Sequence, residues 1–223
     1  MKNSAINSEY QHLKSQIRPA QLELLGGFHP ADTDGAPEGC KTVLLLGPLE
    51  PGFWPVLTDS AEFRDGKADP VDRWSLRVVS QLAQDLGATP VFPFGGPPWH
   101  PFISWALRSA QSFSSPVSLL VHDKAGLMVS YRGALAFSHH IELPATQPSP
   151  CQSCAGRPCI SACPAGAITE GQYDVPACHT FLDTPEGQDC LQGGCLVRRA
   201  CPVSRTYPRA PAQSAFHMSA FHR

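Results

Sequence analysis

Apolar residues recur at different spacings along the chain, and each spacing predicts a different element. Scattered apolar positions in residues 1–26 predict one or two short helices that end at the pair Gly26-Gly27. Residues 41–47 form a short, continuously apolar run closed by glycine and proline. A run of that length and composition is typical of a buried strand. We therefore expect the chain to begin with helix and to form its first strand at residues 41–47.

The clearest helical pattern of the chain spans residues 69–87. Asp69 stands where a helix cap is expected, apolar residues follow at helical spacing, and Gly87 supplies a stop. Residues 89–94 then predict a second strand, punctuated by prolines. A strand, a long helix and another strand are therefore expected in succession.

The pattern that follows predicts a short helix, a hairpin and a linker. The short helix is expected over residues 102–111. Two extended segments, residues 117–122 and 127–137, are separated by a short turn that suits a β-hairpin. Residues 144–150 hold three prolines and predict a linker.

Composition limits the size and the environment of the protein. The chain has 223 residues, 42% of them apolar and only 16% charged, which allows one domain with a smaller appendage or two small domains. A net charge of −2 gives no reason to expect nucleic acid or an anionic membrane as a partner. No apolar run is long enough to span a bilayer and no secretory signal is seen, which predicts a cytoplasmic protein with reduced thiols.

Eight of the nine cysteines lie within residues 151–201 and form two groups of four. The first group is a C-x2-C-x4-C-x3-C-P run, and the second is more widely spaced but also ends in Cys-Pro. Each [4Fe–4S] cluster takes four thiolates, so the two groups match the ligand demand of two clusters. The first group comprises Cys151, Cys154, Cys159 and Cys163; the second comprises Cys178, Cys190, Cys195 and Cys201.

In two-cluster ferredoxins the fourth cysteine of each run binds the cluster of the other run. Applied here, this rule predicts one cluster bound by Cys151, Cys154, Cys159 and Cys201. It predicts a second cluster bound by Cys163, Cys178, Cys190 and Cys195. Paired zinc sites and disulfides are the alternatives for the same thiols, and the C-x3-C-P ending favours the clusters over both. Cys40, far upstream, is most simply a small buried apolar residue.

The cysteine pattern resembles that of a known family. Residues 151–202 resemble the dicluster ferredoxin domain of epoxyqueuosine reductases and, more loosely, of reductive dehalogenases. The stretch Cys163-Pro-Ala-Gly-Ala-Ile168 is similar to the first Cys-Pro ending of that domain, and Cys178 corresponds to its lone cysteine. The closing motif corresponds to Cys190, Cys195 and Cys201-Pro202, with wider spacing. The order of ligands in the family agrees with the crossed pairing.

The resemblance extends to the segment before the cysteines. Residues 119–137, followed by Leu143-Pro144, are similar to the last strands before the clusters in that family. The N-terminal part then resembles a reduced form of the nitroreductase-like cobalamin domain shared with the cobalamin-processing chaperones, which implies cobalamin or flavin as a further candidate cofactor. The family's A-G-L-G-W-x-G-K signature and Asp-x-His-x-x-Gly cobalamin motif are absent, so the resemblance does not carry queuosine chemistry to this chain.

These features predict an α+β protein with an α/β sandwich-like domain over residues 1–146 and a small two-cluster ferredoxin-like domain over residues 151–205. Residues 206–223 form a tail in which residues 215–221 predict a terminal helix. We expect an iron–sulfur protein that passes single electrons to or from a redox partner protein. The alternative is a reductase whose clusters feed a cofactor of cobalamin or flavin type, or a substrate, bound by the N-terminal domain; the sequence leaves open whether the protein is an enzyme.

A few side chains outside the ligand set also suggest chemistry. Trp74 either lines a pocket for a flat cofactor or belongs to the core. Tyr131 and Arg132 either deliver a proton or hold an anion, or they face solvent from a strand. Arg198 and Arg199, between the last two ligands, either stabilise a reduced cluster, dock an acidic partner or form a solvated helix face.

Overall fold

The computed structural model describes residues 8–222, which belong to two compact units. The first unit comprises Met1–Gln111 and Ser130–Gln147, and the second comprises Ser112–Val129 and Pro148–Arg223. The chain therefore leaves the first unit, returns to it at residue 130 and leaves it again within the proline-rich stretch. All four tryptophans lie in the first unit, and both groups of four cysteines lie in the second.

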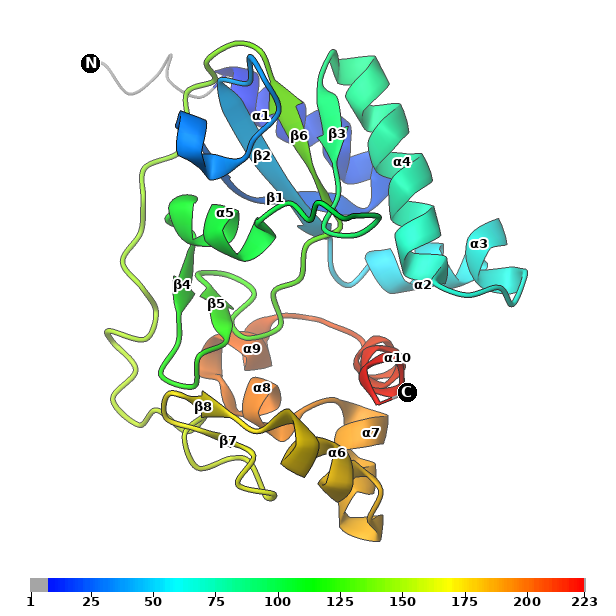
Figure 1. Ribbon diagram of the computed structural model, residues 1–223, viewed down its shortest axis with the longest axis vertical. Coiled ribbons are helices and arrows are strands. Elements are labelled where there is room, and N and C mark those ends of the chain that lie inside the picture. The colour runs from blue at the N-terminus through cyan, green and yellow to red at the C-terminus, as the bar shows by residue number, and fades with distance from the viewer. Residues whose placement is uncertain (1–7, 223) are drawn as a thin grey trace. The chain divides into compact units, whose positions relative to one another are not determined.

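The first unit is an antiparallel sheet with helices packed against it (Figure 1). Its strands, in the order in which they pair, are β1 (Leu22–Phe28), β2 (Thr42–Pro48), β6 (Gly133–Phe137) and β3 (Thr89–Val91). Its helices are α1 (Ser8–Ile17), α2 (Phe53–Asp59), α3 (Ala61–Arg64), α4 (Pro70–Leu86) and α5 (Phe102–Arg108). Short 3₁₀ turns cover Arg18–Ala20 and Asp32–Asp34.

The core of this unit follows from the apolar run predicted for residues 41–47. Strand β2 is buried along its whole length, because β1 and β6 pair with it on either side. Helix α4 packs on β3 and β6, while α1 and α5 pack on β1. Gly133 permits the close approach of α4, since a Cβ at that position would lie 3.2 Å from a methyl group of Val79.

Helix α4 confirms the predicted helix and corrects its cap. The helix ends at Gly87, whose φ of 65° is the left-handed conformation expected of a glycine stop. Asp69 also adopts a left-handed conformation, and its side chain makes no capping hydrogen bond. Pro70 instead begins the helix, because its fixed φ suits the first helical position.

The helices predicted up to Gly26-Gly27 are correct only in their first part. Residues 8–17 are helical, but residues 22–28 form strand β1. The two glycines disfavour helix, and pairing with β2 buries the leucines around them. Gly26 sits at a register shift with a φ of 122°, where a Cβ would lie 2.6 Å from Oγ of Ser109, so only glycine fits.

The predicted hairpin between residues 117–122 and 127–137 is wrong. A turn does form, closed by a bridge between His122 and Gly126, but the two segments pair with different strands. Strand β5 pairs with β4 in the second unit, whereas β6 inserts between β2 and β3 in the first. Strand β3 and helix α5 are also shorter than predicted, ending at Val91 and Arg108.

The second unit is mainly helical. Its strands form two small antiparallel pairs, β4 (Ser112–Ser114) with β5 (Leu120–His122), and β7 (Ile168–Thr169) with β8 (Gln172–Tyr173). Its helices are α6 (Val175–Leu182), α7 (Gln188–Gly193), α8 (Leu196–Ala200), α9 (Pro202–Thr206) and α10 (Pro211–Phe221), with a 3₁₀ turn at Pro185–Gly187. Helix α10 contains the predicted terminal helix and packs on α7.

Residues from the 112–129 segment and from the cysteine region share one core in the second unit. This core joins Val117, Val121 and Leu127 to Cys159, Ile168, Val197 and Cys201. Ser204 anchors the segment further, because its Oγ accepts a hydrogen bond of 2.8 Å from the buried N–H of Leu127. Within residues 8–222, no helix has both the length and the apolar character needed to cross a membrane.

Candidate functional site

The structure brings four cysteines from both sequence groups together around one cavity. Cys151, Cys154, Cys159 and Cys201, the first quartet, line a cavity of about 520 Å³. Three of them come from turns between residues 150 and 160, and the fourth comes from the end of the second group. Cys159 and Cys201 are buried, and the other two are partly exposed.

Two short helices place Cys201 beside the first group. Cys201 ends α8 and precedes α9, and its carbonyl accepts the N–H of Arg205 at 3.1 Å. Pro202 occupies the first position of α9, where the missing N–H costs nothing. The proline after this cysteine therefore turns the chain out of one helix and into the next.

The remaining four cysteines, Cys163, Cys178, Cys190 and Cys195, form the second quartet. They line a smaller cavity of about 20 Å³, together with Leu182, Val197, Met218 and other apolar residues. Helix α6 carries Cys178 and is capped by Asp174, whose carboxylate accepts the N–H of Ala177 at 2.9 Å. Helix α7 carries Cys190, and Cys195 lies directly before α8.

Burial and neighbouring sulfurs raise the pKa of four of these thiols. Burial raises the pKa of Cys151 and Cys159, and the first-quartet neighbours of each raise it further. In the second quartet burial likewise raises the pKa of Cys178 and Cys190, with Cys195 adding to the effect in both. A cation bound among the sulfurs would reverse this balance, because it stabilises the thiolates it coordinates.

The donor chemistry of both quartets fits an iron–sulfur cluster. Four thiolates are the full ligand set of a [4Fe–4S] cube, and no His, Asp or Glu among the described residues lines either cavity. Within residues 8–222, no three His, Cys, Asp or Glu side chains converge tightly enough to hold a single metal ion.

The two cavities differ in the space they offer. The first is far larger than the roughly 10–15 Å³ that one water needs, whereas the second, at about 20 Å³, holds about one water. A cube at the second quartet would require this cavity to widen. Met218 lines that cavity and is the side chain best suited to yield, because its unbranched chain adapts to irregular space.

Donors to sulfur surround the second quartet. Cys178 accepts a hydrogen bond from the hydroxyl of Tyr173, and Cys190 accepts one from the backbone N–H of Leu196. Arg199 lowers the pKa of Cys190 through its charge, and its guanidinium is fixed by Asp189 at 2.6 Å. These bonds stabilise negative charge on the ligand sulfurs.

The two arginines between the last ligands are held inside the second unit. Arg198 donates to the carbonyl of Leu127, and Arg199 donates to the carbonyl of Gly194 at 3.0 Å. Neither guanidinium is therefore simply part of a solvated helix face. The charge effect of Arg199 on Cys190 favours electrostatic support of the second quartet for that residue, whereas the contact of Arg198 with Leu127 does not decide between the alternatives.

Four aromatic residues beside the second quartet were not anticipated from the sequence. The rings of Tyr173 and Phe221 stack at 6.4 Å, and those of Phe221 and His179 stack at 4.5 Å. His222 continues the series, with its ring 5.1 Å from that of His179. The sequence offered one signal of this series, the position of His179 directly after Cys178. The ring partners of His179, Phe221 and His222, lie at the end of α10, more than 30 residues away.

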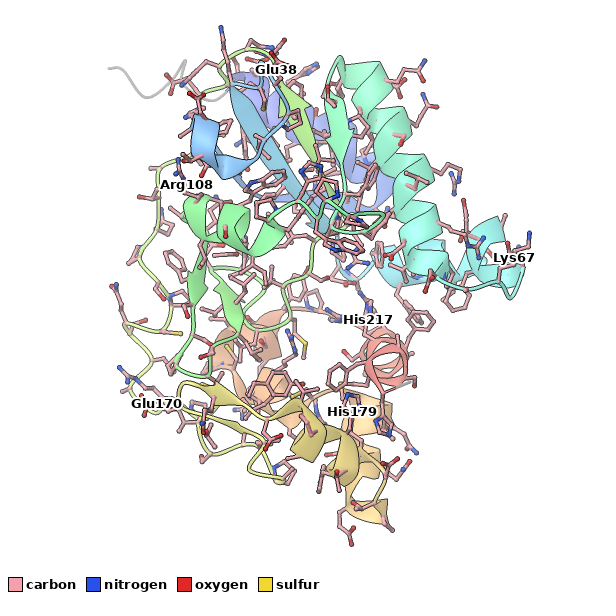
Figure 2. The ribbon with its side chains drawn as sticks, in the orientation of Figure 1. Glu38, Lys67, Arg108, Glu170, His179 and His217 are labelled. Carbon is pink, nitrogen blue, oxygen red and sulfur yellow. The ribbon has the colours of Figure 1, made fainter. Side chains whose placement is uncertain are left out.

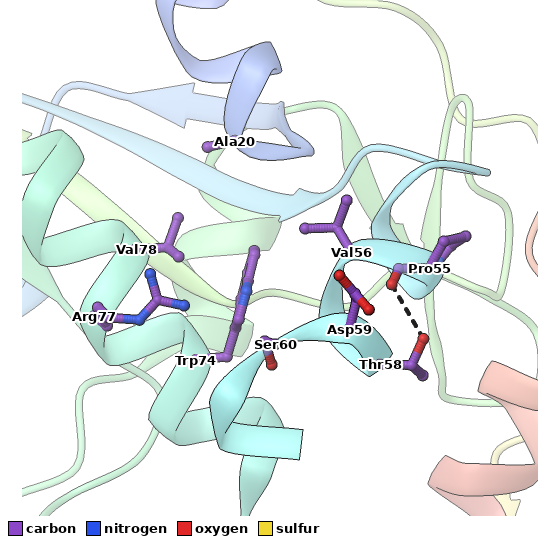
Figure 3. A pocket seen from close by; sticks show the side chains of 9 residues that line it. All are labelled: Ala20, Pro55, Val56, Thr58, Asp59, Ser60, Trp74, Arg77 and Val78. Carbon is purple, nitrogen blue, oxygen red and sulfur yellow. Dashed lines mark hydrogen bonds between the residues drawn. The ribbon is translucent and has the colours of Figure 1, made fainter. Parts of the chain in front are cut away.

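A further cavity lies in the first unit, between the 3₁₀ turn Arg18–Ala20, α2 and α4 (Figure 3). It measures about 760 Å³ and is lined in part by Trp74, Arg77 and Asp59. Trp74 is only 2% exposed and meets Phe53 edge to face at 5.2 Å, so it belongs to the core. Arg77 binds Glu62 through Nε and Nη2, and the other polar lining residues are Thr58, Asp59 and Ser60.

Tyr131 and Arg132 lie in the first unit and do not face solvent. Tyr131 is buried, and its hydroxyl donates to the carbonyl of Leu25 at 3.4 Å. The side chain of Arg132 is 14% exposed, and its Nη1 lies 4.0 Å from Oδ1 of Asp72. The solvent-facing alternative for this pair is therefore wrong. Cys40 is partly exposed, and its thiol donates to the carbonyl of Thr42 at 3.3 Å.

No disulfide joins any of the nine cysteines. Comparison of the chain with protein-family models, with curated proteins and with solved structures found no match.

Proposed function

We propose that this protein is an electron carrier whose second unit binds two [4Fe–4S] clusters, one at each quartet, and exchanges single electrons with a redox partner protein. The supporting observation is that each cavity is lined by four cysteines, three from one sequence group and one from the other. This crossed arrangement is typical of two-cluster ferredoxins. It also agrees with the dicluster ferredoxin domain that the sequence resembles.

When bound, the clusters would supply one-electron redox chemistry, and the protein would supply ligands, shielding and hydrogen bonds. Apolar residues such as Leu127 and Val197 keep water from the quartets. Tyr173 and the N–H of Leu196 donate to ligand sulfurs. We propose a reducing compartment such as the cytoplasm, because the thiols must stay reduced to bind iron.

Iron, sulfide and zinc analysis after anaerobic reconstitution tests this function. We expect about eight irons and eight sulfides per chain, a broad visible absorption that dithionite bleaches, and an EPR signal in the reduced state. Stoichiometric zinc without sulfide would instead indicate paired Cys₄ zinc sites. Far fewer than eight irons, with no sulfide, would refute the proposal.

A ladder of cysteine variants tests the crossed assignment. The double variant Cys151→Ser/Cys154→Ser should retain about four irons, because only the first quartet is broken. Adding Cys201→Ser should change nothing further, whereas adding Cys163→Ser should remove the remaining cluster. The reverse result would show that each sequence group binds its own cluster.

A second candidate function is a reductase that passes electrons to a cofactor or substrate in the first unit. The cavity beside Trp74 and Arg77 favours it, because about 760 Å³ is within the range of small-molecule sites. Mass spectrometry of small molecules released from the purified protein separates the two functions. A retained corrinoid or flavin supports the reductase, and its absence leaves the electron carrier.

A further inference from the structure

The surface beside the second quartet carries exposed apolar side chains. Tyr173, Val175 and Phe221 are 38%, 37% and 36% exposed. The rings of Tyr173 and Phe221 lie at an interplanar angle of 24°, so they present one aromatic layer. Aromatic side chains of this kind are concentrated at the centres of protein–protein interfaces.

Tyr173 links this surface to the second quartet. Its hydroxyl lowers the pKa of Cys178 by donating toward that sulfur, while the residue is 38% exposed. Tyr173 therefore lies both beside the second quartet and at the surface of the protein. No comparable donor with an exposed ring is found among the described residues that line the first quartet.

The chain beside this surface is acidic between residues 158 and 197, although Arg198, which follows directly, acts on Tyr173 through its charge. Residues 158–197 contain five carboxylates and no lysine or arginine, whereas the whole chain has a net charge of only −2. The rest of the chain therefore carries a net charge of +3, from −2 minus −5. The five carboxylates belong to Glu170, Asp174, Asp183, Glu186 and Asp189.

Three of these carboxylates are available to a partner. Asp183 and Asp189 already bind His222 and Arg199. Glu170, Asp174 and Glu186 are exposed, and none of them forms an ion pair with a cation within residues 8–222. Figure 2 labels Glu170 at the turn between β7 and β8, two strands that lead directly to Tyr173 and α6.

We infer that the surface formed by Tyr173, Val175 and Phe221 with these three carboxylates, the acidic-aromatic surface, docks a redox partner protein that presents a basic patch around an apolar centre. The inference rests on the proposed function, because it assumes a redox group at the second quartet. The protein loses one electron and the acceptor of the partner gains one; no bond is broken and no proton moves. Opposite charges would steer the encounter, and the aromatic layer would fill the centre of the contact.

Cytochrome c, a basic one-electron haem protein, is the probe for this surface. We expect the reconstituted full-length protein to bind it in calorimetry at low ionic strength and to lose most of that binding at 0.5 M salt, because exposed charges are screened. Cytochrome c with succinylated lysines keeps its haem but reverses its charge, so it should not bind. Absence of salt-sensitive binding to the unmodified probe overturns the inference.

A charge-neutralising variant locates the binding. Glu170→Gln/Asp174→Asn/Glu186→Gln should raise the dissociation constant about tenfold or more, since each rim charge contributes part of the attraction. Asn still caps a helix as well as Asp does, so α6 and Cys178 stay in place. The control Glu38→Gln/Asp85→Asn/Glu142→Gln removes the same charge from exposed positions of the first unit and should lower the affinity far less. Equal losses in the two variants would refute the docking surface.

The iron content of the same samples keeps the two proposals apart. If the protein holds about eight irons but the triple variant binds cytochrome c unchanged, the docking surface fails and the electron carrier stands. If the protein holds no iron yet binds the probe through Glu170, Asp174 and Glu186, the electron carrier fails and the surface stands. Stopped-flow reduction of cytochrome c by the reduced protein should slow in the triple variant in parallel with the loss of affinity.

Discussion

The Nδ1 atoms of His179 and His222 lie 2.8 Å apart, which requires a hydrogen bond between the two imidazoles. Asp183 accepts from Nε2 of His222 at 3.0 Å, so a neutral His222 carries its proton there and offers a lone pair at Nδ1. His179 is then the donor. The end of α10 is thereby fastened to α6 at the residue next to Cys178 of the second quartet.

Replacing His222 with alanine should loosen this fastening. The variant loses two hydrogen bonds, to His179 and Asp183, and one ring stack, so we expect local stability of α10 to fall by about 1–3 kcal/mol. Hydrogen exchange followed by mass spectrometry should show faster exchange in residues 211–222. Ser219→Ala, at an exposed position of the same helix, serves as the control and should exchange like the wild type. Equal exchange in His222→Ala and wild type would show that the histidine contact does not hold the helix.

Replacing Tyr173 with phenylalanine tests the hydrogen bond to Cys178. A donor to a ligand sulfur stabilises the more negative, reduced cluster, so its removal should lower the reduction potential of the second cluster. We expect a fall of about 20–60 mV, that is, up to about a tenfold change for one electron. EPR-monitored potentiometry of the reconstituted protein measures it.

The matched control for this change is Tyr131→Phe in the first unit. Its hydroxyl is bonded to the carbonyl of Leu25, so both cluster potentials should remain as in the wild type. An unchanged potential in Tyr173→Phe, with full iron content, would contradict the tuning role. A shift in both variants would indicate a general loss of structure.

We expect the first unit to lose stability in acid, because the ion pair between Glu62 and Arg77 is lost when Glu62 is protonated. The hydrogen bonds from Arg77 hold the pKa of Glu62 at about 2, below its ordinary 4.5. Because the folded-state pKa is the lower one, the pair stabilises the fold above about pH 4.5 and loses this effect as the pH falls toward 2. Arg77 is largely exposed, so the contribution is that of a surface ion pair, about 0.2–1 kcal/mol.

Urea unfolding of Glu62→Gln at several pH values measures this contribution. Tryptophan fluorescence reports on the first unit alone, since all four tryptophans belong to it. The variant should be less stable than the wild type at pH 7, and the difference should shrink between pH 5 and pH 2. A difference that stays constant over this range, or that appears equally in Glu38→Gln, would contradict the assignment.

Removing the hydroxyl of Ser204 should weaken the attachment of residues 120–129 to α9 within the second unit. Ser204→Ala leaves the buried N–H of Leu127 without its acceptor, which costs about 1–3 kcal/mol. Exchange of the amides in residues 120–129 should accelerate. Thr206→Ala, which removes an exposed hydroxyl from the same helix, should leave these amides unaffected. Protection that survives in Ser204→Ala would show that the segment is held by its apolar contacts alone.

The spacing of apolar residues within a segment predicted those helices and strands whose buried positions follow from that spacing alone. Strand β2 and helix α4 appear where the apolar run and the helical spacing placed them. The cysteine groups also come together, since four thiols around a common centre follow from the spacing and from the rule for two-cluster proteins. The mixed α+β character of the chain is confirmed by the antiparallel sheet and the helical cysteine region.

Pairings between distant segments could not be predicted in this way. The turn at residues 123–126 is real, yet residues 133–137 are apolar on both faces and pair between two other strands instead of folding back. Similarly, Leu22 and its neighbours become a strand only because β2 offers a partner. The aromatic series beside Cys178 depends on where α10 packs, which the sequence of α6 does not encode.

Each quartet takes one cysteine from the other sequence group, and this arrangement has a consequence for biosynthesis. The ribosome completes the first three cysteines of the first quartet at Cys159, but the fourth, Cys201, emerges 42 residues later. By then the other site has already received Cys163 from the leading group. If the quartets bind clusters as proposed, neither site can be completed on the growing polypeptide until residues of both sequence groups have emerged.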